Sequence, residues 1–465
     1  MRIIIFGTGN IYEKYKNDIS SEDEIIAFID NAIQKQGSIL DGKPIFAPKS
    51  ILNMKYDRIV VMSISDIQMK EQLLHLGCDR KRIWHCQEYL GRNKKPENDL
   101  VLPHRTIKDK KRCLIITNPL GYHGGALSAV YAALALKTKG YEVYVAAEKC
   151  DRTFQCEFQS QGINFLIAPN LQFAGWENLK WTSGFDKILV NTYPMIFCAS
   201  EIAKHHKTAL WLHESDICYS GMRFWNDISV SECQEKGITL YAVSEKAKKN
   251  FIRHAGAADI TVLPYGIPDI CRNSPQEFSG GEKGKDGFVT FAVIGTLHPI
   301  KRQDIFIKAI KLLRKEVYEQ ARFLIIGKRD NPACQDYEKM IKQLACGIHN
   351  IQFTGELSRR EMINIFTKID VVVVASEQET MSIAATEAMM NSKVCIVSST
   401  AGIAEIIEDR VNGRLFELDD TDELAKIMEE CIVHKDELWK MEGEARKTYE
   451  KYFTMEQFAD RLEQI

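Results

Sequence analysis

Residues 370–389 read DVVVVASEQETMSIAATEAM, in which four consecutive valines precede an acidic loop and a run of small residues. A short continuous apolar run of this kind is typical of a strand buried on both faces of a parallel sheet. The small residues that follow favour a helix beginning near Ser382. The stretch therefore predicts a strand–loop–helix unit with Glu379 in the loop and Glu387 one to two turns inside the helix. Taken alone, the two acids are equally explained as a loop acid and a solvated helical acid.

The same alternation of short Val/Ile/Leu runs with helical stretches extends through all 465 residues. This is the pattern of βα units that form parallel sheets, so we expect an α/β fold with three Rossmann-like units. Two polar segments with Pro or Gly interrupt the pattern and indicate linkers. The expected division is an accessory Rossmann-like domain over residues 1–92, a linker over 93–110, a second unit over 111–272, a linker over 273–287 and a third unit over 288–465, whose last helix is a candidate for crossing back.

Composition and charge exclude several classes of protein. Hydrophobic residues make up 45% and charged residues 27%, which is ordinary globular usage. The 61 basic and 63 acidic residues leave a net charge of −2, so the chain lacks the signature of a nucleic-acid binder. No apolar run is long enough to span a bilayer, and the first residues begin a strand rather than a secretion signal. The 13 cysteines are scattered without a C-x-x-C pair, so we expect reduced thiols in a cytoplasmic protein.

The accessory domain begins with a motif that is typical of nucleotide sites. Gly7-Thr8-Gly9 follows a first predicted strand, and Asp30 ends the second. A Gly-x-Gly turn with such an acid starts a Rossmann nucleotide site, so Gly7, Gly9 and Asp30 are candidate ligand residues. Tyr12 stands where a third glycine is usual. A tight turn without ligand explains the two glycines equally well.

The second unit offers two candidate ligand positions. Gly124-Gly125 precede a helical run, where backbone amides and the helix N-terminus attract a phosphate, although a flexible turn is the alternative. His213 and Glu214 follow a strand over 208–212, at the edge where open α/β sheets bind ligands. A histidine there is also explained by packing.

The third unit carries a turn followed by two cations. Gly295-Thr296 follow a strand over 289–294, and Lys301-Arg302 precede a helix that begins near Gln303. Cations beside a helix N-terminus suit a diphosphate, and a solvated helix start is the alternative. Thr354-Gly355 end another predicted strand.

Taken in this order, the motifs resemble the retaining GT-B glycosyltransferases of glycosyltransferase family 4. The resemblance covers about residues 110–465 and includes Gly-x-Leu-x-x-x-Lys, Phe-Thr-Gly and Glu-x7-Glu-Ala-Met. It implies that the second and third units form a two-domain GT-B fold around a central cleft. Thr296 stands where the family usually has Arg, and Thr380-Met381 replace its usual Phe-Gly. The first unit resembles the Rossmann-like domain attached to many bacterial sugar-modifying enzymes.

The resemblance implies transfer of a sugar from a nucleotide-diphosphate sugar, with a UDP-sugar favoured, to an acceptor hydroxyl with retention. Lys301 would stabilise the leaving diphosphate, Glu379 would bind sugar hydroxyls, and Glu387 would hold the ribose. The departing phosphate would take the acceptor proton. The implied catalytic candidates are Lys301, Glu379 and His213, and the implied donor-binding candidates are Gly124, Gly125, Gly295, Thr296, Arg302, Thr354, Gly355, Thr380, Met381, Ser382 and Glu387.

No cofactor or metal is expected to be required, with the nucleotide sugar as donor substrate and a nucleotide in the N-terminal domain left open. Asp420-Thr421-Asp422 resembles a metal-binding Asp-x-Asp, but Glu423 and an apolar helical run follow it. This spacing favours a helix capping box over a metal site.

The acceptor is expected to be a glycan, a lipid-linked glycan or a glycoprotein in bacterial surface polysaccharide or glycoconjugate biosynthesis. A basic helical stretch and nearby aromatic rings make peripheral contact with the inner face of an anionic membrane a candidate, and a solvated helix with ordinary packed rings is the alternative. These residues are Lys246, Lys248, Lys249, Arg253, His254, Trp176, Trp181, Phe224 and Trp225. A GT-B sugar-nucleotide epimerase and a non-catalytic nucleotide-sugar-binding scaffold are the alternative functions.

Overall fold

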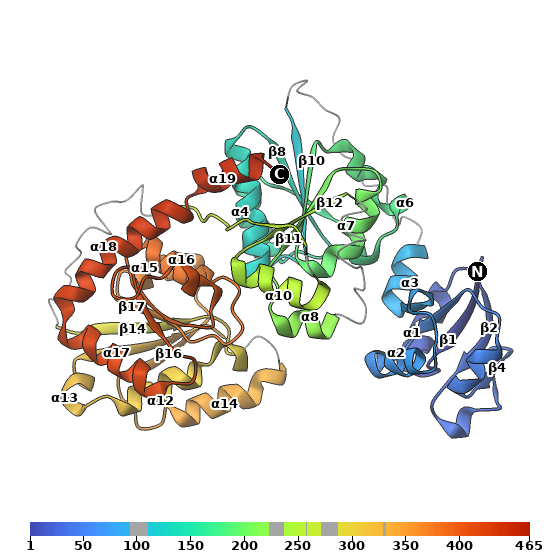
Figure 1. The fold of residues 1–465 in the computed structure, drawn as a ribbon, viewed down its shortest axis with the longest axis horizontal. Coiled ribbons are helices and arrows are strands. Elements are labelled where there is room, and N and C mark those ends of the chain that lie inside the picture. The colour runs from blue at the N-terminus through green and yellow to red at the C-terminus, as the bar shows by residue number, and fades with distance from the viewer. Residues whose placement is uncertain (94–109, 223–236, 257, 271–286, 329–331) are drawn as a thin grey trace.

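Three sheets organise the chain, and each is built from the predicted βα units (Figure 1). The computed structural model describes residues 1–93, 110–222, 237–256, 258–270, 287–328 and 332–465. Both predicted linkers, apart from residues 93, 110 and 287, lie outside this part of the chain, as do Phe224 and Trp225. The expected α/β class with several Rossmann-like units is confirmed.

The first sheet has the strand order β3-β4-β2-β1-β5-β6, and its strands pair in parallel except for β3 with β4. Ile3, Ile5 and Phe28 form part of its apolar core. Its elements are β1 (Arg2–Phe6), α1 (Asn10–Tyr15), β2 (Glu24–Ile29), β3 (Ile39–Leu40), β4 (Lys43–Phe46), β5 (Arg58–Val61), α2 (Asp66–His75), β6 (Ile83–His85) and α3 (Cys86–Asn93).

The second sheet is fully parallel, with the order β13-β12-β11-β10-β7-β8-β9. Its central strands β7 and β11 are buried along their whole length, as expected for a sheet covered on both faces. Its elements are β7 (Arg112–Ile116), α4 (Gly124–Thr138), β8 (Glu142–Ala147), α5 (Arg152–Ser160), β9 (Asn164–Ile167), α6 (Trp176–Leu179), β10 (Lys187–Asn191), α7 (Ile196–Ala203), β11 (Thr208–Leu212), α8 (Asp216–Met222), β12 (Ile238–Ala242), α10 (Glu245–Ala255) and β13 (Ile260–Val262).

The third sheet is also parallel, with the order β16-β15-β14-β17-β18-β19. The four valines of the opening stretch form β17, and Ser382 caps α16, as the sequence predicted. The elements are β14 (Val289–Ile294), α12 (Gln303–Leu312), α13 (Lys315–Tyr318), β15 (Ala321–Ile326), α14 (Gln335–Leu344), β16 (Ile351–Gly355), α15 (Arg359–Phe366), β17 (Val371–Val374), α16 (Ile383–Met390), β18 (Val394–Ser398), β19 (Arg414–Phe416), α17 (Thr421–Val433), α18 (Lys435–Tyr452) and α19 (Met455–Glu463).

The second and third units share one continuous apolar core that extends from β7 to α19. The chain returns to the second unit at its end, because α19 packs against α4 (Figure 1). The Lys187 ammonium donates to the main-chain oxygens of Leu462 (2.7 Å) and Ile465 (3.0 Å). A Cβ at Gly266 would lie 2.7 Å from the Phe458 Cβ, so only glycine permits this close approach. The last helix therefore joins the two units.

The accessory domain docks on the second unit through α3, which packs against the short 3-10 helix η5 (Leu171–Phe173). A Cβ at Gly91 would lie 2.7 Å from the Cβ of Phe173. The Arg92 guanidinium lies over the rings of Trp84 (5.1 Å) and Phe197 (5.5 Å), one from each unit. Close packing and a shared cation therefore hold the domain in place.

We predict that Gly91→Val loosens this contact, because the new side chain overlaps Phe173. Overpacking of this kind costs about 1–3 kcal/mol. Small-angle X-ray scattering should show a larger radius of gyration, and thermal unfolding should begin at a lower temperature. Gly443→Val is the control, because Gly443 is also helical but has open space around its Cβ position. Equal scattering profiles for the two variants would contradict the docking.

Candidate active site between the second and third units

The predicted lysine and the first predicted glutamate meet at the carboxyl edge of the third sheet. Lys301 ends the short 3-10 helix η8 (Pro299–Lys301), and its Nζ forms an ion pair with Oε2 of Glu379 in the loop after β17. The Glu377 amide donates to the Ile300 main-chain oxygen (2.9 Å) and holds the two loops together. Both charged side chains are mostly covered, with 26% of Lys301 and 15% of Glu379 exposed. The predicted cation and the predicted sugar-binding carboxylate are thus side by side.

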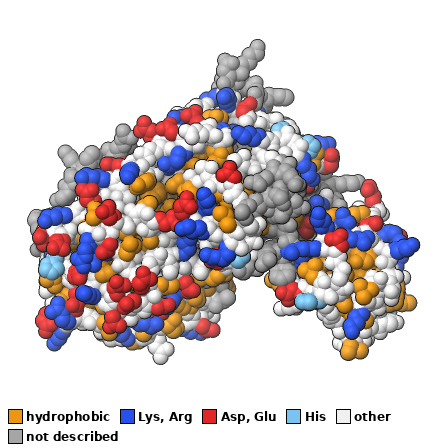
Figure 2. Space-filling view, in the orientation of Figure 1, with side chains coloured by type: hydrophobic (Ala, Val, Ile, Leu, Met, Phe, Trp, Pro, Cys, Tyr) orange, Lys and Arg blue, Asp and Glu red, His pale blue; other side chains and the backbone are white. Residues whose placement is uncertain are grey.

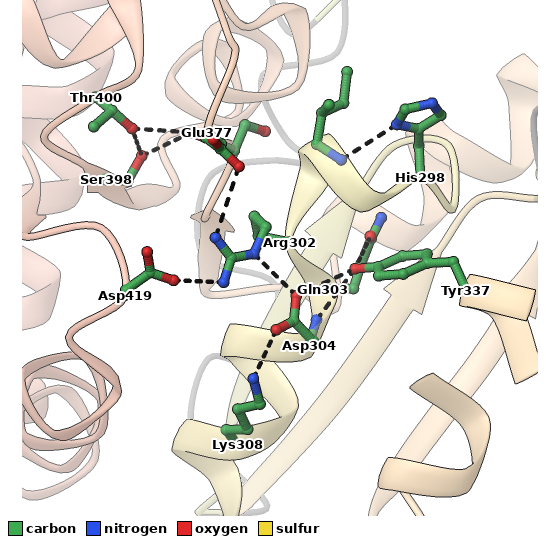
Figure 3. A network of polar contacts seen from close by, with 12 residues as sticks. His298, Arg302, Gln303, Asp304, Lys308, Tyr337, Glu377, Ser398, Thr400 and Asp419 are labelled. Atoms are coloured by element: carbon green, nitrogen blue, oxygen red, sulfur yellow. Dashed lines mark hydrogen bonds and ion pairs between the residues drawn. The ribbon is translucent and has the colours of Figure 1, made fainter. Parts of the chain in front are cut away.

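The second predicted cation, Arg302, is engaged elsewhere. Its guanidinium pairs with Asp304 (3.2 Å), with Asp419 and with Glu377 (3.8 Å), as Figure 3 shows. Arg302 also adopts a left-handed backbone conformation with φ +51°. Three acids therefore occupy the guanidinium of Arg302, which the sequence predicted to bind a diphosphate. Lys301 is the cation that pairs with Glu379.

Gly295 and Thr296 form the turn that follows β14 and leads to Lys301. Gly295 has a φ of +148°, and the Thr296 main-chain oxygen accepts a hydrogen bond from the Gln303 side chain (2.8 Å). Tyr337 in turn donates to Gln303 (3.0 Å; Figure 3). The predicted turn is thus fixed from α12 and α14, with its backbone beside the start of α12.

The second predicted glutamate is paired with an arginine that the sequence analysis missed. Glu387 of α16 forms an ion pair with Arg359, the first residue of α15. Arg359 also lies beside the phenol of Tyr131 from α4, and burial raises the pKa of Tyr131. The signal available in the sequence was a cation directly after Phe-Thr-Gly-Glu-Leu-Ser, because β16 ends at Gly355 and α15 follows it.

Thr380 connects the third unit to the second at the loop that carries Glu379. Its hydroxyl donates to the His213 main-chain oxygen (2.6 Å), and its own main-chain oxygen accepts from the Ser244 hydroxyl (2.6 Å). A Cβ at Gly402 would lie 1.8 Å from the Thr380 oxygen, so this loop needs glycine beside it. Thr380, which was predicted to bind the donor, is therefore hydrogen-bonded across the interface between the third and second units. These bonds place His213 next to the loop that carries Glu379.

The start of α4, which is predicted to face an anion, approaches the start of α16 from the other unit. A Cβ at Gly124, the first residue of α4, would lie 3.9 Å from Cδ1 of Ile383, the first residue of α16. The Gly125 main-chain oxygen accepts from the Asn191 side chain (2.8 Å). Two positive helix ends therefore lie next to each other. Among the other candidates, Met381 and Ser382 directly precede α16, with Ser382 as its N-cap, and Thr354 and Gly355 end β16.

We call the ends of β10 and β11, with Asn191, Thr192 and His213, the wall of the second unit. Three of its buried polar atoms lack a hydrogen-bond partner among the described residues. They are Asn191 Oδ1, Thr192 Oγ1 and His213 Nε2. Burial lowers the pKa of His213 to about 3, so the imidazole is neutral at physiological pH. Asn191 and Thr192 were not predicted, because nothing in a strand end reading Val-Asn-Thr-Tyr-Pro distinguishes a ligand residue from a packed one.

Glu214, next to His213, is a buried carboxylate. One oxygen accepts the Tyr193 amide (2.9 Å), and the other accepts the His213 amide (2.9 Å) and lies 3.4 Å from the Tyr219 hydroxyl. Its exposure is 7%, and burial raises its pKa to about 7. The backbone amides only partly offset the cost of removing this charge from water.

The candidate residues of the accessory domain have local partners. The Asp30 carboxylate accepts from the Thr8 amide (3.0 Å) and the Ala32 amide (2.8 Å), and it pairs with Lys35 (3.4 Å). A Cβ at Gly7 would lie 2.6 Å from the Met62 oxygen, so close packing accounts for that glycine. The position of Gly9 is open. A nucleotide in this domain stays a prediction.

Asp420 acts as the N-cap of α17, accepting from the Glu423 amide (2.8 Å). Glu423 does not complete the predicted capping box, because its carboxylate accepts the Glu417 amide (2.7 Å) instead. No group of three or more potential metal ligands occurs in the part of the chain that the structure describes.

The basic stretch forms α10, where Arg253 and His254 both pair with Asp216 of α8. Trp176 lies in α6 and Trp181 in a 3-10 helix, and the Trp176 ring stacks on His205 with ring centroids 3.7 Å apart. On the face seen in Figure 2, basic and acidic side chains are interspersed. None of the described helices is long and apolar enough to cross a membrane.

The raised pKa of Glu214 predicts a pH dependence of stability. A carboxyl whose pKa is higher in the folded than in the unfolded state stabilises the fold below about pH 4.5, and this contribution is lost as the pH rises through about 7. As the pH rises from 5 to 8, the free energy of unfolding of Glu214→Gln should increase relative to that of the wild type, by up to about 3 kcal/mol. Chemical unfolding of both proteins at the two pH values measures this difference. A difference that does not change with pH would refute the assignment.

Two segments of the chain match known protein families. Residues 276–448 match the family described as glycosyl transferases group 1, and residues 1–84 match the family described as C2185-like, N-terminal. An uncharacterized glycosyltransferase of Methanocaldococcus jannaschii is 30% identical over 164 residues, which are 35% of this chain and 43% of the relative. A UDP-Gal:alpha-D-GlcNAc-diphosphoundecaprenol alpha-1,3-galactosyltransferase of Escherichia coli is 26% identical over 215 residues, 43% of this chain and 51% of the relative. The chain spans less than half the length of the first curated relatives it matches.

Solved structures share the fold over a longer part of the chain. Anabaena Alr3699/HepE in complex with UDP superposes with a TM-score of 0.64 at 18% identity, over 76% of this chain and 98% of that one. WaaG, a glycosyltransferase involved in lipopolysaccharide biosynthesis, gives a TM-score of 0.56 at 14% identity, over 76% of this chain and 99% of that one. At these identities the likeness establishes the fold, which is the expected GT-B arrangement. Residues 276–448 thus match the glycosyl transferases group 1 family, and the described parts of the second and third units have the two-domain GT-B fold.

Proposed function

We propose that the chain is a retaining glycosyltransferase that moves a sugar from a nucleotide-diphosphate sugar, with a UDP-sugar favoured, to an acceptor hydroxyl. The observation that carries this proposal is the Lys301–Glu379 ion pair beside the Thr380–His213 contact. A cation for a leaving diphosphate and a carboxylate for sugar hydroxyls are there set against the second unit. The group 1 family match, which includes Lys301, Glu379 and Thr380, supports this interpretation.

In the proposed reaction the bond between the anomeric carbon and the diphosphate oxygen breaks, and its electron pair passes to that oxygen. Lys301 and the N-termini of α4 and α16 offset the developing negative charge. The acceptor oxygen then forms the new bond on the same face, and its proton goes to the departing phosphate. No protein nucleophile, cofactor or metal is required for this balance.

Glu387 is proposed to bind the ribose hydroxyls of the donor. In the structure this carboxylate is held by Arg359, whose guanidinium is mostly buried beside Tyr131. A buried carboxylate of this kind is costly without a cation, so Arg359 stabilises Glu387 until the ribose hydroxyls replace part of the contact. Arg359 would then lie next to the nucleoside.

The donor and acceptor classes are supported by the relatives. HepE was solved in complex with UDP-glucose, and the Escherichia coli relative is named for transfer from UDP-Gal to a diphosphoundecaprenol-linked sugar. We propose a UDP-hexose as donor and a glycan or lipid-linked glycan as acceptor, in surface polysaccharide or glycoconjugate biosynthesis. A cytoplasmic enzyme with peripheral contact at an anionic membrane would fit such an acceptor.

We predict that Lys301→Ala lowers the rate of UDP release from the UDP-hexose that the wild type uses by about 100-fold or more, because a preorganised charge at the leaving group is lost. A panel of UDP-glucose, UDP-galactose and UDP-N-acetylglucosamine, assayed for UDP release with and without glycan acceptors, measures it. Lys311→Ala is the control, because Lys311 is an exposed lysine at the end of α12.

Equal rates for Lys301→Ala and Lys311→Ala would exclude the proposed role of Lys301. Formation of an epimeric UDP-sugar from donor alone, without acceptor, would replace the transferase assignment with that of an epimerase. Absence of UDP release and of any ligand-induced stabilisation would favour a non-catalytic protein.

A further inference from the structure

Glu214 lies where two neighbouring strands of the second sheet end. Strands β10 and β11 are paired in parallel with Asn191 opposite Trp211, so the turns after them lie side by side. The first turn begins with Thr192-Tyr193, and the second is His213-Glu214. The two oxygens of Glu214 accept one main-chain amide from each turn, Tyr193 and His213, both at 2.9 Å. One carboxylate therefore braces both turns.

The braced turns carry the polar groups of the second unit's wall. Thr192 Oγ1 and His213 Nε2 are buried without a hydrogen-bond partner among the described residues. The His213 main-chain oxygen accepts the Thr380 hydroxyl, which follows Glu379 directly in the chain. A shift of either turn would therefore move the wall relative to the Lys301–Glu379 pair.

This brace is maintained against two costs. Thr192, a β-branched residue, has a φ of +81°, a conformation that costs about 1–3 kcal/mol and persists only where the surroundings impose it. Glu214 itself is a buried carboxylate, whose ionisation is unfavourable without full compensation. Costs of this kind gather at functional sites, where geometry is maintained at the expense of stability.

We propose that Glu214 is a positioning residue, which holds the Thr192 and His213 turns in the geometry that sugar transfer requires. The inference rests on the proposed function and deepens it, since Glu214 contacts the turns and not the donor. It also explains why a carboxylate stands here: two acceptor oxygens are needed for two amides. The side chain of Gln offers one acceptor oxygen and an NH2 group, so one amide would lose its partner.

The test compares Glu214→Gln with Glu429→Gln in the full chain. Glu429 is a matched control, because its carboxylate also accepts a main-chain amide, that of Arg314 (2.7 Å), but between α13 and α17. We expect hydrogen exchange at the Tyr193 and His213 amides to become faster in Glu214→Gln alone. We expect kcat for UDP release from the UDP-hexose used by the wild type to fall by about 10- to 100-fold, as for a small misplacement, with a smaller change in the donor KM.

The pH dependence of kcat gives a second readout. Protonation makes one oxygen of Glu214 a donor, so kcat of the wild type should fall as the pH drops through about 7, and this limb should be absent in Glu214→Gln. Among the described residues, the titratable side chain that contacts the carboxyl is the phenol of Tyr219, while Tyr193 and His213 contribute main-chain amides and α10 contributes the Asn250 amide, which donates to the Glu214 main-chain oxygen. A phenol that titrated instead would leave the limb in place in the variant.

Unchanged exchange, or faster exchange with unchanged kcat, would overturn the proposal. A wild type that releases UDP from none of the donors would refute the proposed function instead. Hydrogen exchange tests the brace even if the wild type releases no UDP. Equal exchange at the Tyr193 and His213 amides in the wild type and Glu214→Gln would refute the brace, and faster exchange in the variant would establish it.

Discussion

The contact at Thr380 is the constraint on which the interdomain site depends. This residue is bonded twice to the second unit, through its hydroxyl to His213 and through its main-chain oxygen from Ser244. Ser244 is at the same time the N-cap of α10, so its hydroxyl serves a helix end and the interface together. Because Thr380 adjoins Glu379, the position of the Lys301–Glu379 pair against the second unit follows from these bonds.

The charges of the site are balanced locally, which reconciles the proposed binding of a diphosphate by cations with a net charge of −2. Lys301 is paired with Glu379, and Arg359 with Glu387. An ion pair that is partly covered costs less than an isolated buried charge, and an anionic ligand can exchange for the carboxylate. The cations are therefore held in place without making the surface basic, and the mixed charges of Figure 2 agree with this.

Sequence reasoning found the parts of the site that depend on local pattern. The valine run of β17, the cap at Ser382 and the position of Glu387 inside α16 are set by neighbours in the chain. Arg359 and Thr192 could not be found in this way, because their partners are remote: Arg359 meets Glu387 28 residues later, and Thr192 lies beside Gly125. Arg302 shows the converse. It is adjacent to Lys301 in the sequence, but its guanidinium pairs with Asp419 of another loop.

The accessory domain is connected to this site by packing rather than by its own candidate ligand residues. Helix α3 rests on η5, and η5 contacts the 3-10 helix η7 (Tyr193–Met195), which begins with the residue whose amide Glu214 accepts. The contacts are rigid, since Gly91 leaves no room between α3 and Phe173. Stiff packing transmits displacement more readily than a flexible tether does. The first 93 residues thus support the wall that faces Lys301, whether or not they bind a nucleotide themselves.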